Sequence, residues 1–402
     1  MKCLDSARVL HAAVRSLGEL PQPDEAAQAA SEALTRLIRE EIERTGGAIP
    51  FARFMELVLY APGRGYYSGG SRKFGEAGDF TTAPELSPLF SRCLARQCLQ
   101  ILQQLGEGDL LEFGAGSGVM AAELLAELER LGRLPRHYYI AELSGELRQR
   151  QQETITKRLP HLVERVVWLD ELPETFRGVI LGNEVLDAMP AQRFLVTEGV
   201  ARELGVAWHD GQFADALLAE SAPAVASALK ALLDEARLDD GYSSEISLAA
   251  QEWIATLAQL LDAGAILLID YGFPRREYYH PQRKEGTLMC HYRHRSHPDP
   301  YAFVGLQDIT AHVDFTAIAE AAAQHGLHVA GFANQASFLL SMGILEMMGE
   351  AQETREQMAY AGQVRRLLQP EEMGELFKVI ALTRGFDEPL LGFGLRDERA
   401  RL

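Results

Sequence analysis

The sequence predicts an α/β fold: a doubly wound, mainly parallel sheet with a helical N-terminal part and an inserted helical and β segment. Three observations predict it. Short apolar runs that end in glycine or an acidic residue alternate with helical stretches through the middle of the chain. A glycine-rich turn, "LLEFGAGSGVM" at 110–120, joins the first of these runs to a helix. The length of 402 residues and the 47% of hydrophobic residues supply a core large enough to bury such a sheet.

The N-terminal residues precede the sheet. Residues 1–30 are rich in alanine and polar residues and predict a flexible arm, so order is expected from about residue 31. Residues 31–77 predict a helical lid region, because "SEALTRLIREEIERTG" has apolar residues at helical spacing and a second short helix ends at Pro62. These two helices are expected to cover the ligand edge of the sheet.

The sheet is expected in two parts. Residues 78–199 hold its first part, with the apolar runs "DLLEFG", "HYYIAEL", "RVVWLD" and "GVILGNEVL". Residues 200–260 predict an insertion that is a candidate substrate-recognition subdomain. Residues 261–402 hold the second part, with the run "GAILLIDYG" followed by C-terminal helices and strands. The ligand crevice of such a sheet lies at the carboxyl ends of its strands.

Charge and composition limit the classes of partner. A formal net charge of −18 argues against nucleic acid and against an anionic membrane surface, so the partner is expected to be a small molecule or a protein. No apolar run reaches the roughly 18 residues of a membrane span, and the N-terminus has no signal-peptide core. Four cysteines at unrelated spacings predict reduced thiols. We expect a bacterial-type cytoplasmic protein, with the mitochondrial matrix as the less favoured compartment; the sequence does not indicate an oligomeric state.

The glycine turn limits the choice of cofactor. Gly114, Gly116 and Gly118 alternate, with Ala115 between the first two. A dinucleotide fingerprint requires a small residue at Val119, and a phosphate loop requires a following Gly-Lys-Ser/Thr; neither is present. Without a Cβ, the turn lets the backbone approach a ligand closely. A structural strand-to-helix turn is the alternative, and a nicotinamide cofactor is disfavoured.

Two acidic residues favour S-adenosylmethionine (SAM). Glu112 stands two residues before the turn, and Glu142 ends the next strand, where a carboxylate can accept hydrogen bonds from ribose hydroxyls. SAM has no phosphate, so its site needs no cluster of basic residues. The sequence therefore predicts a SAM site that includes both acids and the glycine turn.

Longer segments support a closer comparison. The segments "GDFTTAPELSPLF", "LLEFGAGSGVMAAELL", "GNEVLDAMPAQRF", "GLQDITAHVDFTAIA" and "FKVIALTRG" resemble the MidA-like family of SAM-dependent methyltransferases over about residues 31–385. This family includes the mitochondrial complex I assembly factor that is a protein arginine methyltransferase. The resemblance implies a class I, Rossmann-like methyltransferase fold, SAM as cofactor, and N-methylation of an arginine on a protein, with a respiratory complex subunit as a possible partner.

The segment "GNEVLDAMP" supplies the candidate catalytic residues. It follows the fourth strand, where the substrate edge of a doubly wound fold lies. Glu184 and Asp187 are expected to orient a target guanidinium by paired hydrogen bonds, and Asn183 to line the methyl-transfer site. The structural alternative is that Glu184 caps a following helix and Asp187 binds nearby backbone amides.

The segment "GDFTTAPE" is the remaining cofactor candidate. Gly78, Thr81 and Thr82 suit a loop lying over the cofactor, and the resemblance implies that this segment closes the SAM site. The alternative is an ordinary capping loop, with Thr82 or Ser87 capping the next helix.

No metal site is predicted. His312 and Asp314 lack a third ligand at a recognised spacing, and the histidines of "CHYRHRSHP" are interpreted as part of a solvated loop or a basic surface for an acidic protein partner. Two other functions stay open beside arginine methylation: a non-catalytic SAM-binding assembly factor for a respiratory complex, and a small-molecule methyltransferase.

Overall fold

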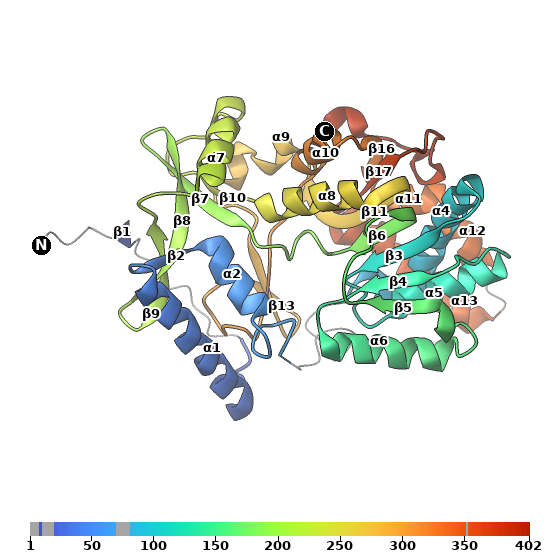
Figure 1. Ribbon diagram of the computed structural model, residues 1–402, viewed down its shortest axis with the longest axis horizontal. Helices are drawn as coiled ribbons and strands as arrows, with labels where there is room; N and C mark the ends of the chain where they lie inside the picture. Colours follow the sequence, from blue (N-terminus) through green and yellow to red (C-terminus); the bar gives the residue numbers. More distant parts are fainter. Residues whose placement is uncertain (1–7, 10–19, 70–80, 351–352) are drawn as a thin grey trace, which may run out of the picture.

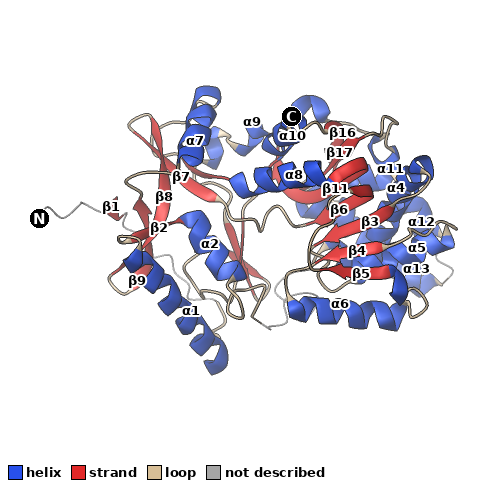
Figure 2. Ribbon diagram, viewed as in Figure 1, coloured by secondary structure: helices blue, strands red, loops and turns tan. Residues whose placement is uncertain are grey.

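Two lobes lie side by side in the computed structural model, which describes residues 8–9, 20–69, 81–350 and 353–402 (Figures 1 and 2). The core lobe contains an eight-stranded sheet of order β16-β17-β11-β6-β3-β4-β5, with β15 (Val313–Asp314) beside β11. The second lobe contains a six-stranded antiparallel sheet of order β1-β9-β8-β7-β10, in which β1 is Arg8–Val9 and β2 lies beside β8, and a three-stranded sheet of order β13-β12-β14.

The core sheet is mainly parallel, as predicted. Its five consecutive parallel strands are β5 (Val166–Leu169), β4 (Tyr138–Ala141), β3 (Asp109–Phe113), β6 (Phe176–Asn183) and β11 (Leu261–Phe273). Only β17 (Phe377–Arg384) runs against them among the described strands of this sheet, between β11 and β16 (His328–Asn334). The chain builds outward in one direction from β3 and in the other from β6, so the crevice of the fold is expected between the carboxyl ends of these two strands.

Helices cover both faces of the core sheet. Successive strand residues enter different hydrophobic clusters: Leu110 packs on one face of β3 and Leu111 on the other. The first face is covered by α4 (Pro88–Leu105), α5 (Val119–Arg130), α6 (Gly145–Arg158), α11 (Gln335–Ser341), α12 (Ile344–Gly349) and α13 (Thr354–Leu368). The second is covered by α8 (Leu248–Leu260) and α10 (Phe315–Gln324). Burial on both faces explains why these strands are continuous apolar runs.

The second lobe is assembled from three separate stretches of sequence. The first contains α1 (Glu25–Arg44), β2 (Ala48–Pro50) and α2 (Phe51–Tyr60). The second contains β7 (Gln192–Thr197), β8 (Val200–His209), β9 (Gln212–Leu217), α7 (Pro223–Glu235) and β10 (Ser243–Ile246). The third contains β12 (Met289–Tyr292), β13 (Arg295–His297) and β14 (Asp308–Thr310). Phe54, Val206 and Ile309, one from each stretch, share a single buried cluster.

Several boundaries differ from those expected. Helix α1 begins at Glu25, inside the expected arm 1–30, because the Asp24 carboxylate caps it by accepting from the Ala27 amide at 2.8 Å. Strand β7, inside the expected core segment 78–199, belongs to the second sheet, whereas α8, placed in the insertion 200–260, packs on the core sheet. The sequence of an amphipathic hairpin or helix shows its hydrophobic period, but it does not show which surface the element packs against.

The histidine-rich run also differs from its interpretation as a solvated loop. It forms β12 and β13, which pair antiparallel. Cys290 and Tyr292 are buried while His291 between them is partly exposed, so the run has the two-residue period of a half-buried strand. The expected helical lid packs mainly on the second sheet, through contacts of α1 and α2 with β8.

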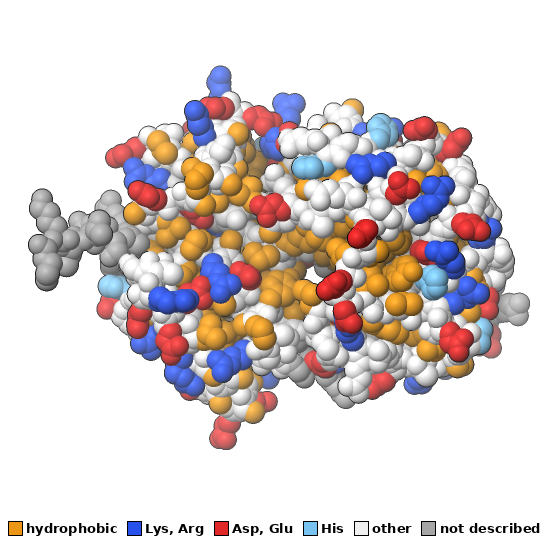
Figure 3. All heavy atoms as spheres, in the orientation of Figure 1, with side chains coloured by type: hydrophobic (Ala, Val, Ile, Leu, Met, Phe, Trp, Pro, Cys, Tyr) orange, Lys and Arg blue, Asp and Glu red, His pale blue; other side chains and the backbone are white. Residues whose placement is uncertain are grey.

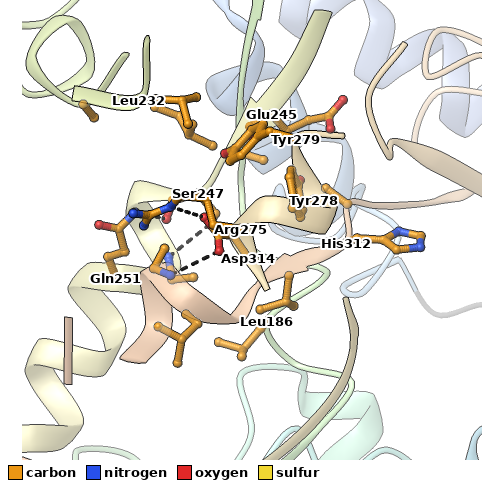
Figure 4. A pocket seen from close by; sticks show the side chains of 18 of the residues that line it. Leu186, Leu232, Glu245, Ser247, Gln251, Arg275, Tyr278, Tyr279, His312 and Asp314 are labelled. Atoms are coloured by element: carbon orange, nitrogen blue, oxygen red, sulfur yellow. Dashed lines mark hydrogen bonds and ion pairs between the residues drawn. The ribbon is translucent and has the colours of Figure 1, made fainter. Parts of the chain in front are cut away.

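An arginine joins the two lobes. Arg275, the first residue of α9 (Arg275–Tyr278), donates to Glu235 of α7 at 2.7 Å and to Asp314 at 3.2 Å, and it also pairs with Glu320 of α10. Figure 4 shows Arg275 and Asp314 in the lining of a cavity, whose volume is about 180 Å³. Asp314 also caps α10 by accepting from the Thr316 and Ala317 amides. Its role is therefore structural, and it forms no pair with His312.

Three further features concern the described part of the chain. Cys93, Cys98 and Cys290 are buried and form no disulfide; Cys3 lies outside the described residues. No described helix combines the length and the apolar character needed to cross a membrane. No group of three or more metal-ligating side chains is found among the residues that the structure describes.

Candidate active site

A large cavity lies between the lobes at the carboxyl ends of the core strands. Its volume is about 1410 Å³, and its lining includes the glycine turn after β3, Glu142 after β4 and the segment after β6. Residues of α2, β12 and β14 line it from the second lobe. Figure 3 shows a hollow between the lobes with apolar side chains on both sides and acidic side chains around it. Because sites for one small ligand measure roughly 300–1,000 Å³, this cavity has room for a cofactor and part of a second substrate.

Part of the glycine turn lines the cavity. Gly114, Ala115 and Gly116 line it, and Gly116 has a φ of 52° with nothing within 4 Å of the position that a Cβ would take. A side chain there would enter the space that a ligand approaches. Gly118 lies off the cavity: it precedes α5 with a φ of 81°, and a Cβ there would lie 3.0 Å from Gln151 Cα. Gly118 therefore serves the packing of α5 against α6.

Glu142 is held in place as a hydrogen-bond acceptor. One carboxylate oxygen accepts from the Ser144 amide at 2.9 Å and the other from Gln151 Nε2 at 3.0 Å. The same Gln151 amide group donates to the carbonyl of Gly116, so one buried side chain links the glycine turn to the acid. A carboxylate has about four acceptor positions, which leaves room for ribose hydroxyls. This arrangement fits the nucleoside part of SAM.

Glu112 lies deeper in the same wall. It is 1% exposed, and the Tyr138 hydroxyl donates to it at 2.7 Å. Burial raises the pKa of Glu112 to about 7; the Tyr138 hydrogen bond opposes that rise, and the charge of Glu142 adds to it. A ligand that brings a positive charge or a donor to this wall would favour the ionised form.

The segment after β6 brings the three candidate catalytic residues into the same cavity. Asn183, Glu184 and Asp187 all line it, and Asn183 Nδ2 donates to Glu184 Oε1 at 2.9 Å. Glu184 has a φ of 52°, an unusual conformation for a residue with a side chain, and such backbone strain is concentrated at functional sites. Burial, together with the smaller effect of the nearby Asp187 charge, raises the pKa of Glu184 to about 8.

The sequence left a purely structural role open for Glu184 and for Asp187, and the structure gives a different answer for each. No helix follows Glu184, so its interpretation as a helix cap is wrong. Asp187 does accept from backbone amides, its own and that of Ala188, and from the Tyr271 hydroxyl, all of which oppose the rise in its pKa that burial causes. Its Oδ1, however, has no hydrogen-bond partner among the described residues.

Asp270, which the sequence analysis did not select, fixes this turn. Its Oδ2 accepts from the amides of Leu186 and Asp187 at 2.9 and 3.2 Å, and its Oδ1 accepts from the Tyr271 amide. Burial and the charges of Asp187 and Glu184 raise the pKa of Asp270 well above its usual value. Asp270 lies in β11 one residue beyond Ile269, the last residue that pairs with β6, so the signal was an acidic residue where a neighbouring apolar run ends.

The segment "GDFTTAPE" lies partly within the described residues. Gly78 lies outside them, whereas Thr81 and Thr82 line the cavity. The short helix α3 (Ala83–Leu86) that follows contacts both halves of the site: the Ala83 amide donates to Glu184, and Ser117 of the glycine turn donates to Glu85. Ser87 caps α4 by accepting from the Leu89 amide, as the capping alternative proposed, whereas Thr82 makes no side-chain cap.

Other lining residues were missed for different reasons. Asp170 follows β5 as Glu142 follows β4, so the same rule would have found it. Leu143, 95% exposed beside Glu142, offers an apolar surface that a flat base can cover. Tyr60, Tyr67 and Asp308 come from the second lobe, and no local pattern connects them with the glycine turn.

The fold and the cavity together define a class I methyltransferase: a parallel sheet with one reversed strand, an acid before a glycine turn, and an acid at the end of the adjacent strand. A family model described as "Putative S-adenosyl-L-methionine-dependent methyltransferase" matches residues 93–333. The chain belongs to this family, whose methyl donor is SAM. The cradle around Gly116 and the acceptor at Glu142 fit that cofactor.

Comparisons with individual proteins agree with this assignment. The chain is 48% identical to a Burkholderia thailandensis protein crystallised with S-adenosyl-homocysteine, with a TM-score of 0.92 over 96% of this chain and 100% of that one. It is 28% identical to the protein arginine methyltransferase NDUFAF7 homolog, mitochondrial, of Drosophila melanogaster, over 91% of this chain and 88% of the fly protein. It is 27% identical to the Homo sapiens NDUFAF7 protein, over 84% of this chain and 81% of that protein.

Proposed function

We propose that this methyltransferase acts on proteins and methylates an arginine. The observation that carries the proposal is that Asn183, Glu184 and Asp187 share one cavity with the glycine turn and Glu142. A guanidinium is planar and delocalised, and carboxylates bind it by paired hydrogen bonds that fix its plane. The names of the relatives, protein arginine methyltransferases at 27–29% identity, support the same acceptor.

The residues of this chain would act mainly by positioning. SAM supplies an electrophilic methyl group on a positively charged sulfur. Glu142 would hold the ribose, and the Gly114–Gly116 backbone would lie against the cofactor, which fixes the direction from which the methyl group is presented. Glu184 and Asp187 would bind two nitrogens of the guanidinium, so that the third nitrogen points at the methyl group.

One proton leaves the guanidinium for each methyl group that it gains, because the product again carries a single positive charge. A carboxylate whose pKa lies near the working pH is suited to accept it. Glu184 fits this role, since burial raises its pKa to about 8. The acceptor protein is proposed to be cytoplasmic, and a respiratory complex subunit is the first candidate because the MidA-like family, which the chain resembles, includes a mitochondrial complex I assembly factor.

The test separates cofactor binding from transfer. Proteins from cells that lack this gene are incubated with isotope-labelled SAM and either the wild-type protein or Glu184→Gln, then hydrolysed and searched for methylated arginine. We expect labelled methylarginine with the wild type and a loss of about 100-fold in rate with Glu184→Gln, a typical effect of removing a positioned charged group. SAM affinity of the variant, measured by calorimetry, should stay within about twofold of the wild type, since one well-separated contact is removed.

The other outcomes distinguish the alternatives. SAM binding without any labelled amino acid would contradict the proposal and favour a SAM-binding assembly factor. Label that stays in small molecules would favour a small-molecule methyltransferase. Label in lysine would leave the enzyme class intact and overturn the acceptor.

A further inference from the structure

A second carboxylate faces the candidate catalytic segment from across the cavity. Asp308 lies at the start of β14 in the second lobe and is 3% exposed, yet it lines the cavity. Its negative charge contributes to the raised pKa of Glu184, so the two carboxylates lie within electrostatic reach of each other. The acids of the cavity therefore come from both lobes.

Two tyrosines connect Asp308 with the segment after β6. The Tyr67 hydroxyl donates to Asp308 Oδ1 at 2.9 Å, and the Tyr60 hydroxyl donates to the carbonyl of Ala188 at 2.9 Å. The two rings stack with centroids 5.4 Å apart and an interplanar angle of 21°. This pair connects Ala188, next to Asp187, with Asp308. It also offers aromatic surface to a flat cation.

Two side-chain oxygen atoms of the segment after β6 lack a hydrogen-bond partner among the described residues. Asp187 is 5% exposed and Asn183 is 9% exposed, and neither Asp187 Oδ1 nor Asn183 Oδ1 accepts a hydrogen bond from any described residue. Buried acceptors without partners are costly, so such atoms indicate a missing donor. A guanidinium, with five N–H groups and no acceptor, is a ligand of the required kind.

The two arginines of the described lining already have acidic partners. Arg148 pairs with Asp170 at 2.6 Å, and Arg366 pairs with Glu372 at 3.1 Å. The buried His312 stays uncharged, because burial lowers its pKa to about 4. The remaining acids of the lining can therefore bind a positively charged segment, whose charge would favour their ionised forms.

We propose that the cleft between the lobes receives a basic protein segment, and that Asp308, oriented by Tyr67 and Tyr60, binds the target guanidinium opposite Asp187 and Asn183. This inference rests on the proposed function and adds the second lobe as the part that selects arginine. A lysine ammonium has the same charge but lacks the planar array of donors needed to reach both walls.

The experiment measures binding rather than turnover. Two peptides of equal charge, GGRGRGRGG and GGKGKGKGG, are titrated by calorimetry into protein saturated with S-adenosylhomocysteine. The wild type is expected to bind the arginine peptide at least about tenfold more tightly than the lysine peptide, as loss of charge-assisted, two-point contacts would give. Asp308→Asn, which keeps the shape and the acceptor for Tyr67, should lose most of this preference. The matched control, Glu372→Gln, removes another acid of the lining and should change both affinities equally.

The outcomes decide between the inference and the proposed function. Equal binding of the two peptides by the wild type, binding of neither, or an unchanged preference in Asp308→Asn would overturn the inference. If Asp308→Asn no longer binds S-adenosylhomocysteine, Tyr67→Phe decides: its arginine-peptide affinity should fall about threefold, as for one lost orienting hydrogen bond, and no change would overturn the inference. If arginine methylation is insensitive to Asp308→Asn, the proposed function holds and this inference fails. If peptide binding depends on Asp308 but no methyl group is transferred, the proposed function fails and the binding role of Asp308 holds.

Discussion

The two lobes contribute to one cavity in different ways. In the core lobe the site comes from short segments at strand ends: the glycine turn after β3, Glu142 after β4 and Glu184 after β6. In the second lobe it comes from Tyr60, Tyr67 and Asp308, which are brought together by packing between distant parts of the sequence. The cofactor half of such an enzyme can thus be read from local patterns, whereas the acceptor half depends on long-range contacts.

The first way to sharpen this comparison is to block the cofactor half alone. Gly116→Val places a branched side chain where the cavity is open, so S-adenosylhomocysteine affinity should fall at least about 100-fold, or about 2.7 kcal/mol, in calorimetry. Gly132→Val is the matched control, because Gly132 also has a positive φ, 74°, and open space around its Cβ position, but lies off the cavity. Equal losses in both variants would show that backbone strain, and not occupation of the cradle, causes the effect.

A second prediction concerns the junction of the lobes. Arg275→Met leaves Asp314, Glu235 and Glu320 without their shared cation, and the two lobes lose the ion pairs that join α7 to α10. Removing one partner of a largely buried ion pair is destabilising, here by about 2 kcal/mol, since two of the three acids are half exposed. The melting temperature should fall by about 3 °C, with S-adenosylhomocysteine affinity nearly unchanged.

The control for that prediction is Arg399→Met, which removes an exposed ion pair with Asp397 in the core lobe. Its melting temperature should stay within about 1 °C of the wild type. If Arg275→Met also abolished cofactor binding, the two halves of the site would not be independent, and the comparison between the lobes would fail.

The smallest effect expected is a pH dependence at Glu184. Its pKa rises from 4.5 to about 8 in the folded chain because the carboxyl is buried, so between these values the folded state holds a proton that the unfolded state has lost. This contribution to stability is complete below pH 4.5 and is lost as the pH rises towards 8. The glutamine of Glu184→Gln does not titrate, so the variant does not lose this stability as the pH rises. Relative to the wild type, the melting temperature of the variant should be higher at pH 7 than at pH 6, by about 2 °C, since one pH unit within this window changes the free energy of unfolding by about 1.4 kcal/mol.

Glu153→Gln, at an exposed position of α6, serves as the surface control for this measurement. Ligand-free protein is required, because a bound cation would change the protonation of Glu184. A melting-temperature difference that did not change between pH 6 and pH 7 would mean that Glu184 is ionised throughout, and its proposed role as proton acceptor near neutral pH would then fail.

The same contrast explains what the sequence predicted and what it did not. The strands "DLLEFG", "HYYIAEL" and "GVILGNEVL" were predicted because a strand buried on both faces is recognisable from composition alone, and their ends placed Glu112, Glu142 and Glu184 at one edge. The sequence analysis missed that β7, which begins at Gln192, belongs to the second sheet, because the sequence of a strand does not show which sheet it joins. Asp308 was missed because its partner, Tyr67, lies 241 residues away.

The discontinuous second lobe also affects the order in which the chain can fold during synthesis. Phe54 and Val206 reach their full set of neighbours only when Ile309 has been made, and 309 − 246 gives 63 residues between the end of β10 and Ile309. At about 5–20 residues per second, α2 lacks part of its final packing for several seconds on the ribosome. The core lobe likewise stays incomplete until β17, its reversed strand, is inserted between β11 and β16 near the C-terminus. The last strand of the second lobe, β14, is thus made before β17, so the core lobe and the cavity between the lobes are expected to be completed late in translation.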